Sequence, residues 1–245
     1  LDQRDRGVER RRAGGRGRAK RSGLGQGATP LARCRGRTAG ATMNGCKEQP
    51  AVVIVADQDA AGQELASSSM RCPSCSGGSL RPWGHARTRV LRGLHGARHT
   101  LRPRRARCRD CGATHVLLPC HAPPRRADTL QVVMTGLLAH QGGAGARTIA
   151  ADLGVPVDTV RSWVRSVSAH AQWLRERATR WAFRMDPTHP PMQPTGSPLG
   201  DALDALGHAA AATARRVPRP LTAWQLIGLI SAGCLLAPVA STLSG

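Results

Sequence analysis

The sequence RTIAADLGVPVDTVRSWVRSV, residues 147–167, carries the strongest pattern in this chain. Ile149 and Leu153 are spaced to lie on one face of a short helix. Gly154 suits the end of that helix because a residue without Cβ can turn the chain, and Pro156 has the fixed φ of a helix start. The stretch therefore predicts two short helices joined by a tight turn.

The second of these helices has two distinct faces. Its apolar positions recur at helical spacing and predict a buried seam: Val160, Trp163, Val164 and Val167. The opposite face carries the side chains predicted to contact DNA: Val157, Asp158, Arg161, Ser162 and Arg165. Two helices meeting at one seam across a glycine-containing turn are typical of the helix-turn-helix unit, whose second helix reads the major groove. The alternative is an ordinary helical hairpin in a small bundle.

The charge of the chain favours a polyanionic partner. The 245 residues carry a net charge of +21, and the pI is about 11.6. Arginine supplies nearly all of this positive charge. Residues 72–128 hold twelve arginines against Asp110 and Asp128, a net charge of +10. Five Trp, one Phe and no Tyr argue against an aromatic platform for single strands.

Two C-x2-C pairs predict a metal site. Cys72 and Cys75 form the first pair, and Cys108 and Cys111 form the second. No secretory signal is visible, so metal binding is favoured over a disulfide framework. Four thiolates on two tight loops suit one structural Zn²⁺, whereas a redox dithiol pair or a rubredoxin-type iron site are the alternatives. Since four cysteines complete the coordination shell, we expect His115 and His121 to be surface residues.

The segment between the two cysteine pairs is predicted to be a β-hairpin. Its two strands run on either side of Gly93–Gly96, THVLLP adds a third strand, and AVVIV (residues 51–55) adds a lead strand. Together they would form a zinc ribbon. If the returning strand is regular, alternation places Arg98, Arg102 and Arg104 on one face. The ribbon residues predicted to contact DNA are Arg98, Arg102, Arg104 and Arg105.

The flanking segments have weaker signals. Residues 1–50 are rich in Arg and Gly, and we expect them to be disordered. Asp57 and Asp59 follow the lead strand and resemble the metal-binding carboxylates of Toprim nucleotidyl-transfer domains. The required α/β context is missing, so a capped short helix is favoured.

Further helices are predicted after the cysteine-rich segment. Asp128 would be the N-cap of a supporting helix at residues 129–141, and helical sequence continues beyond Val167. A Pro-rich break at residues 187–198 precedes a helix that starts at Ser197-Pro198. Residues 220–245 contain no charge. A membrane span is one interpretation, but a helix docked on the protein or on a dimer partner is preferred.

The order of these motifs carries a resemblance. CPSC, RPWG, CRDCG, THVLLP, a linker with PRR and IAADLGVPVDTVRSWVR together resemble a family of uncharacterised bacterial zinc-ribbon/helix-turn-helix proteins. They are also similar to the DNA-binding front end of some insertion-sequence transposases. The resemblance covers about residues 51–240 and implies DNA binding. A transposase nuclease would need carboxylates on strands to hold two metals. The acids after residue 167 are Glu176, Asp186, Asp201 and Asp204, and no strands are predicted there.

The sequence thus predicts an α+β, mostly α protein, and a non-enzyme. The expected parts are a disordered tail (1–50), a lead strand and zinc ribbon (51–122), a helix-turn-helix domain (127–186), a Pro-rich linker (187–198) and C-terminal helices (199–240). We expect a cytoplasmic, nucleoid-associated protein that binds double-stranded DNA, as a regulator or a transposition accessory. A homodimer is left open, and no small-molecule substrate is expected. The alternatives are a protein-interaction module or a Mg²⁺-dependent nucleotidyl-transfer remnant around Asp57 and Asp59.

Overall fold

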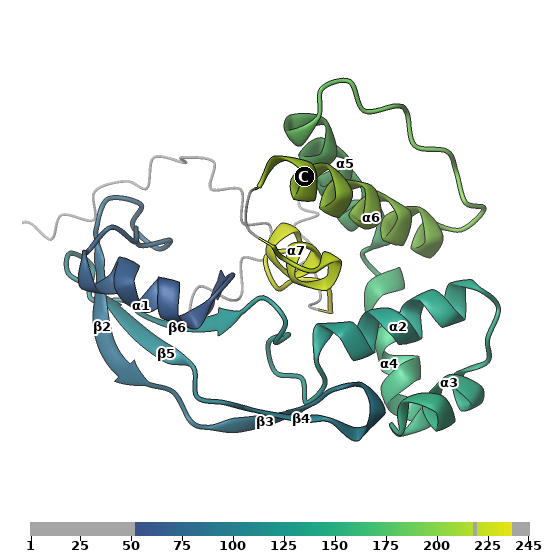
Figure 1. Ribbon diagram of the computed structural model, residues 1–245, viewed down its shortest axis with the longest axis horizontal. Coiled ribbons are helices and arrows are strands. Elements are labelled where there is room, and N and C mark those ends of the chain that lie inside the picture. Colours follow the sequence, from purple (N-terminus) through teal and green to yellow (C-terminus); the bar gives the residue numbers. More distant parts are fainter. Residues whose placement is uncertain (1–51, 218–219, 237–245) are drawn as a thin grey trace, which may run out of the picture. The chain divides into compact units, whose positions relative to one another are not determined.

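The computed structural model describes residues 52–217 and 220–236. The tail of residues 1–50, with Cys34 and Cys46, lies outside the described residues. Within them the protein is α+β, with seven α-helices and six strands in the order that Figure 1 labels. The predicted α+β class is therefore confirmed.

The larger β-sheet has four strands. Their order in the sheet is β1 (Val52–Val55), β6 (Thr114–Pro119), β5 (Arg104–Cys108) and β2 (Leu80–His85). The lead strand β1 pairs in parallel with β6, and the other pairs are antiparallel. The second sheet is the tip of the hairpin, formed by β3 (Arg89–Arg92) and β4 (Arg98–Leu101). The hairpin turns through η1 (Leu94–Gly96), as predicted, but each arm is divided into two strand segments.

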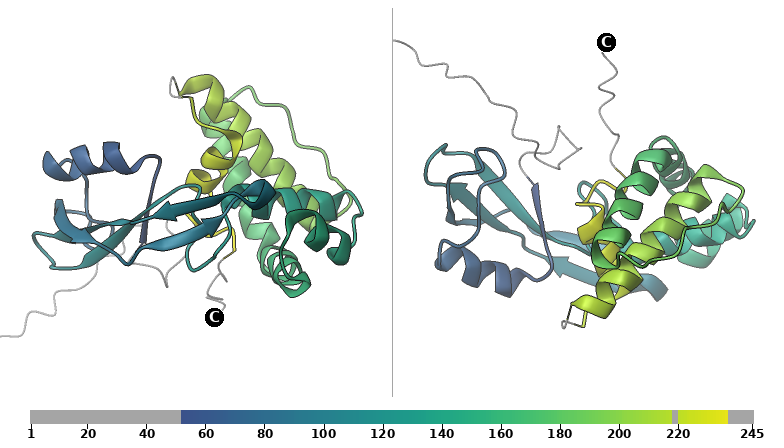
Figure 2. Two further views of the ribbon diagram at one scale, coloured as in Figure 1. Left: turned by 60° about the horizontal axis from the view of Figure 1, so that its bottom comes forward. Right: turned by 90° about the horizontal axis from the view of Figure 1, so that it is seen from above.

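Helix α1 (Gln58–Ala66) packs on one face of the four-stranded sheet, as Figure 2 shows. Leu65 of this helix joins Leu80 and Leu117 in a small core, each at most 2% exposed. We call residues 52–122 the sheet module. Its apolar core is small, so the module needs a further source of stability.

A second and larger core is helical. Its helices are α2 (Leu130–Gln141), α3 (Ala146–Leu153), α4 (Val157–Ser168), α5 (Ala171–Met185), α6 (Pro198–Arg216) and α7 (Ala223–Ile230). Helices α5 and α6 have the most extensive contact of any pair of elements. Ser197 caps α6 by accepting a hydrogen bond from the Gly200 backbone N–H, at the predicted start.

The N-cap of α2 differs from the prediction. Thr129 is the cap, and its Oγ1 accepts from the Val132 backbone N–H. Asp128 is instead 2% exposed and lies 2.8 Å from Nε of Arg92 on β3. A buried carboxylate is costly unless a positive charge pairs with it. Arg92 of the hairpin provides a full positive charge, whereas the N-terminus of a helix provides only a partial one.

Helices α3 and α4 occupy the predicted positions. Gly154 between them has φ 63°, the left-handed conformation that favours glycine. Val160, Trp163 and Val167 of α4 are at most 1% exposed, which confirms most of the predicted seam. Val164 is only half-buried.

The helical sequence after Val167 does not continue as one helix. It breaks at Ala169 and His170, and α5 begins at Ala171. His170 is 5% exposed, and its Nε2 donates to the carbonyl oxygens of Cys234 and Leu235 at 3.1 and 3.0 Å. The break turns this imidazole toward the C-terminal segment, which periodicity alone could not reveal.

We expect His170 to make the stability of the fold pH-dependent. Burial lowers the pKa of this imidazole, so the unfolded chain takes up a proton before the folded chain does. The free energy of unfolding should therefore fall as the pH drops below about 6.5, and this loss should end at the lowered pKa of the folded state. Chemical unfolding at a series of pH values tests this with the variant His170→Gln as control. An equal pH dependence in both proteins would contradict the assignment.

The uncharged C-terminal segment forms a shorter helix than its apolar length suggests. Helix α7 spans Ala223–Ile230, and Thr222 with Gln225 forms a capping box at its start. Leu226, Ile227 and Ile230 are buried in the helical core. In the described part of the chain, no helix is both long and apolar enough to cross a membrane. The predicted docking of this helix on the protein matches its burial.

Candidate metal centre and candidate nucleic-acid surfaces

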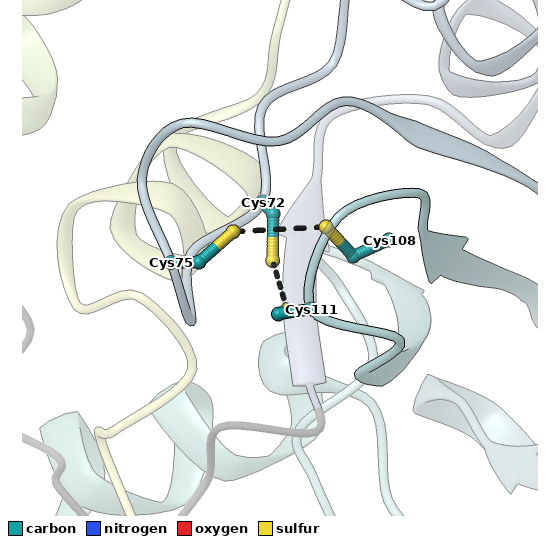
Figure 3. A group of neighbouring side chains, drawn as sticks. All are labelled: Cys72, Cys75, Cys108 and Cys111. Carbon is teal, nitrogen blue, oxygen red and sulfur yellow. Dashed lines mark hydrogen bonds between the residues drawn. The ribbon is translucent and has the colours of Figure 1, made fainter. Parts of the chain in front are cut away.

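The four cysteines of the two C-x2-C pairs converge at one end of the sheet module (Figure 3). Their Sγ atoms all lie within 4.8 Å of one another. Cys72 and Cys111 are 3.8 Å apart, and Cys75 and Cys108 are 3.6 Å apart. These separations are too long for disulfide bonds, so the four thiols are free. Each close contact joins one pair to the other, which closes the site from both loops.

Two tight backbone turns hold the thiols in place. The Cys72 N–H donates to the Gly78 carbonyl, and the Ser76 N–H donates to the Cys72 carbonyl. A Cβ at Gly78 would lie 2.5 Å from the Sγ of Cys108, so the close approach of the two loops requires glycine there. In the second turn Gly112 has φ 71°. The glycines that follow the two cysteine pairs thus allow the loops to turn and to approach each other.

The thiols also influence one another's ionisation. The backbone N–H of Cys111 lowers the pKa of Cys108 to about 7. The backbone N–H of Ala113 lowers the pKa of Cys111, but desolvation and the neighbouring thiols outweigh it and raise that pKa to about 12. Burial also raises the pKa of Cys72. The Cys108 thiol thus ionises readily, and its negative charge disfavours ionisation of the neighbouring thiols. A bound divalent cation would remove this repulsion between thiolates.

The geometry fits a tetrahedral metal ion. At a Zn–S bond length of about 2.3 Å, the edges of a tetrahedron of sulfur atoms are about 3.8 Å. The Sγ–Sγ separations of 3.8 Å and 3.6 Å match that edge. Among the described residues, these cysteines are the single group of three or more His, Cys, Asp or Glu side chains that could hold a metal ion. They can therefore bind a metal, and four thiolates leave no position for a reacting water.

His115 is not a surface residue, contrary to the prediction. It is 0% exposed, and its Nε2 lies 3.5 Å from the Sγ of Cys72. Strand β6 places it on the covered side of the sheet, next to Ala106 of β5. In the tautomer with hydrogen on Nε2, the ring can donate to a Cys72 thiolate. Cysteine spacing identifies the metal ligands themselves. It could not identify His115, because this residue contacts a ligand and is not one. His121 is half-buried, and burial lowers its pKa.

We expect His115 to raise the affinity of the site for metal. Residues that hydrogen-bond to a ligand contribute roughly 10- to 100-fold to affinity. His115→Met removes the N–H, whereas His115→Gln keeps a donor at similar reach. Competition with a chromophoric zinc chelator should show weaker binding for the first variant and partial recovery for the second. Equal affinities in the two variants and the natural protein would disprove the role.

The predicted DNA-contacting face of α4 is mostly exposed. Arg161 and Arg165 are exposed, and Ser162 is half-buried. Asp158 lies 3.1 Å from the guanidinium of Arg161, with both side chains in solvent. Val157 is half-buried and packs against the helical core rather than standing free.

Arg98, Arg102 and Arg104, predicted to share one face of a regular strand, do not lie on one continuous strand. Arg98 lies on β4 in the small sheet, and Arg102 falls between β4 and β5. Arg104 starts β5 on the covered side, where its Nε donates to the Gln58 carbonyl and its Nη2 lies 3.4 Å from Asp59. Arg105 alternates to the opposite side. The expectation failed because the returning strand is interrupted at residues 102–103.

The acidic pair after the lead strand has a structural role here. Asp57 is the N-cap of α1, and its carboxylate accepts from the Asp59 backbone N–H at 2.8 Å. Asp59 pairs with Arg104. This is the capped short helix that the sequence favoured over a nucleotidyl-transfer site.

Comparisons of the chain with protein families, with curated proteins and with solved structures found no match.

Proposed function

We propose that this protein binds double-stranded DNA in a sequence-dependent manner, as a regulator or a transposition accessory. We further propose that its four cysteines hold one structural zinc ion. In this proposal helix α4 enters the major groove and the protein performs no chemistry on the DNA. The zinc ion stabilises the sheet module.

The exposed arginine pair on α4 carries the proposal. Arg161 and Arg165 lie four residues apart, one helical turn from each other, while the other face of the helix is buried. Arginine can bond O6 and N7 of guanine with two hydrogen bonds, and each such pair contributes about 1–3 kcal/mol of discrimination. The ion pair of Arg161 with Asp158 is exposed to solvent and therefore weak. Breaking it so that Arg161 can bond to a base would cost little free energy. The net charge of +21 supports the phosphate contacts.

We expect Arg161→Ala to lose affinity for a preferred site and to keep affinity for random duplex. Sequencing of DNA recovered with the purified protein would supply the preferred site. The loss there should be about 1–3 kcal/mol. Fluorescence anisotropy with specific and random duplexes measures both values.

Two matched variants sharpen this test. Arg180→Ala removes another exposed, acid-paired helix arginine, this time on α5 beside Glu176; it should affect both duplexes slightly and equally. Arg102→Ala, on the exposed hairpin, should weaken both duplexes alike because phosphate contacts carry no base information. If Arg161→Ala and Arg102→Ala reduce specific and random binding by the same factor, α4 does not read bases. If the protein does not bind duplex DNA of any sequence, the protein-interaction alternative is favoured.

A further inference from the structure

The four-stranded sheet has one face covered by α1 and one face turned away from it. Leu80, Ala106 and Leu117 belong to the covered side and are 0% exposed. Because side chains alternate along a strand, their neighbours project from the opposite side. On the edge strand β2 and its neighbour β5, those residues are Arg81, Trp83, Arg105 and Arg107. We call these four residues the open sheet face.

The open sheet face is cationic. Arg81 and Arg107 are directly opposite each other in the β2–β5 pairing, and Arg105 follows two positions along. Within residues 52–217 and 220–236, none of these three arginines forms a salt bridge. The acids of α1 lie on the covered side, where Asp59 pairs with Arg104. The sheet therefore separates charge, with the acids near one face and three cations on the other.

Trp83 adds an aromatic ring to these cations. Trp83 is 42% exposed, so its ring is accessible from solvent. The guanidinium carbons of Arg81 and Arg107 lie 5.2 and 4.8 Å from the ring centroid. Both distances are within the range of a cation–π contact, so the ring is held among its cations. Strand β2 is also the edge of the sheet, so no further strand of the described chain covers that side.

We propose that the open sheet face binds single-stranded nucleic acid, with the arginines on backbone phosphates and Trp83 stacked on one base. Stacking requires a free face of a base, and bases in a duplex have none, so an unpaired strand suits this ring. The scarcity of aromatic residues limits the site to one stacked base, rather than excluding stacking altogether. This activity is separate from the duplex reading proposed for α4, and it involves none of the same residues.

Anisotropy of a labelled oligothymidylate, measured with the full chain at physiological ionic strength, tests the proposal. Trp83→Ala should reduce affinity about 5- to 150-fold, the range that one base–aromatic stack contributes. Trp83→Phe keeps a ring and should retain most of the affinity. Arg81→Gln should weaken binding and lower the slope of log affinity against log salt by about 0.7, as for one phosphate contact on a single strand.

The control is Val90→Ala. Val90 lies on β3 of the same hairpin with a similar exposure of 43%, and its replacement should leave affinity unchanged. Retained metal content and unchanged circular dichroism would show that each variant is folded. Undiminished binding by Trp83→Ala, or an equal loss in Val90→Ala, would overturn the proposal. So would an equal loss on blunt duplex, because the ring would then not be reading an unpaired base.

The two proposals fail separately. Arg161→Ala should leave oligothymidylate binding unchanged, and Trp83→Ala should leave specific duplex binding unchanged. If no preferred duplex is found, binding to oligothymidylate can still be measured. If oligothymidylate does not bind, the duplex affinities can still be compared.

Discussion

Cys108→Ala is expected to abolish metal binding and to unfold the sheet module. The module has a small apolar core, and the Cys108 thiol lies 3.6 Å from Cys75 at the point where the two loops meet. Three remaining thiols cannot complete a tetrahedral shell of sulfur. Zinc binding in small metal modules provides on the order of 10 kcal/mol at neutral pH, and this energy is largely folding energy.

Cys120→Ala is the matched control for this change. Cys120 is also buried, at 4% exposed, and follows β6, but its Sγ contacts the Ala56 carbonyl rather than the cluster. This variant should keep one metal ion per chain and a similar melting temperature. Elemental analysis and thermal melts with and without a chelator measure both properties. An unchanged melt in Cys108→Ala, or a natural protein without bound zinc, would contradict the structural metal site.

Val160→Asp should unfold the helical core. Val160 is 0% exposed on α4, so the new carboxylate would lie among apolar side chains with no cation to pair with it. We expect a loss of about 4 kcal/mol or more, at the extreme of single substitutions. The loss of helical circular dichroism on heating measures it.

Ser162→Asp separates the charge from its burial. Ser162 lies on the same helix and is half-buried on the predicted DNA-contacting face. The same carboxylate there should leave the melting temperature nearly unchanged but reduce duplex affinity by repelling phosphates. If both variants melt alike, the seam between α3 and α4 does not depend on Val160.

The elements that the sequence predicted well are those with local signals. Gly154 marks the turn between α3 and α4, the hairpin turns within Gly93–Gly96, and Ser197 starts α6. Each depends on backbone conformation or periodicity within a few residues. The four cysteines could be grouped because each C-x2-C pair places two thiols on one tight loop, and two such loops can close one site.

The residues that sequence reasoning misplaced depend on distant partners. Asp128 pairs with Arg92, 36 positions earlier, and Arg104 bonds to Gln58, 46 positions earlier. His115 meets Cys72 across the sheet. These partnerships follow from strand register, which single-sequence patterns do not supply. Trp83 likewise gained significance only when β2 and β5 placed two arginines beside its ring.

The parallel pairing of β1 with β6 has a consequence for how the protein is made. Val52 aligns with Val116, 64 positions later. The strands of the hairpin, by contrast, pair residues that are close in the sequence, such as Arg92 with Arg98. During synthesis the hairpin can therefore form early, but VVIV must wait for the second cysteine loop and the strand beyond it. Until then a β-branched segment with unsatisfied backbone groups stays available to other chains. The proposed zinc ion holds the second cysteine loop, which precedes β6, so its absence would prolong this exposure. We therefore expect cells short of zinc to accumulate this protein as aggregate rather than as soluble chain.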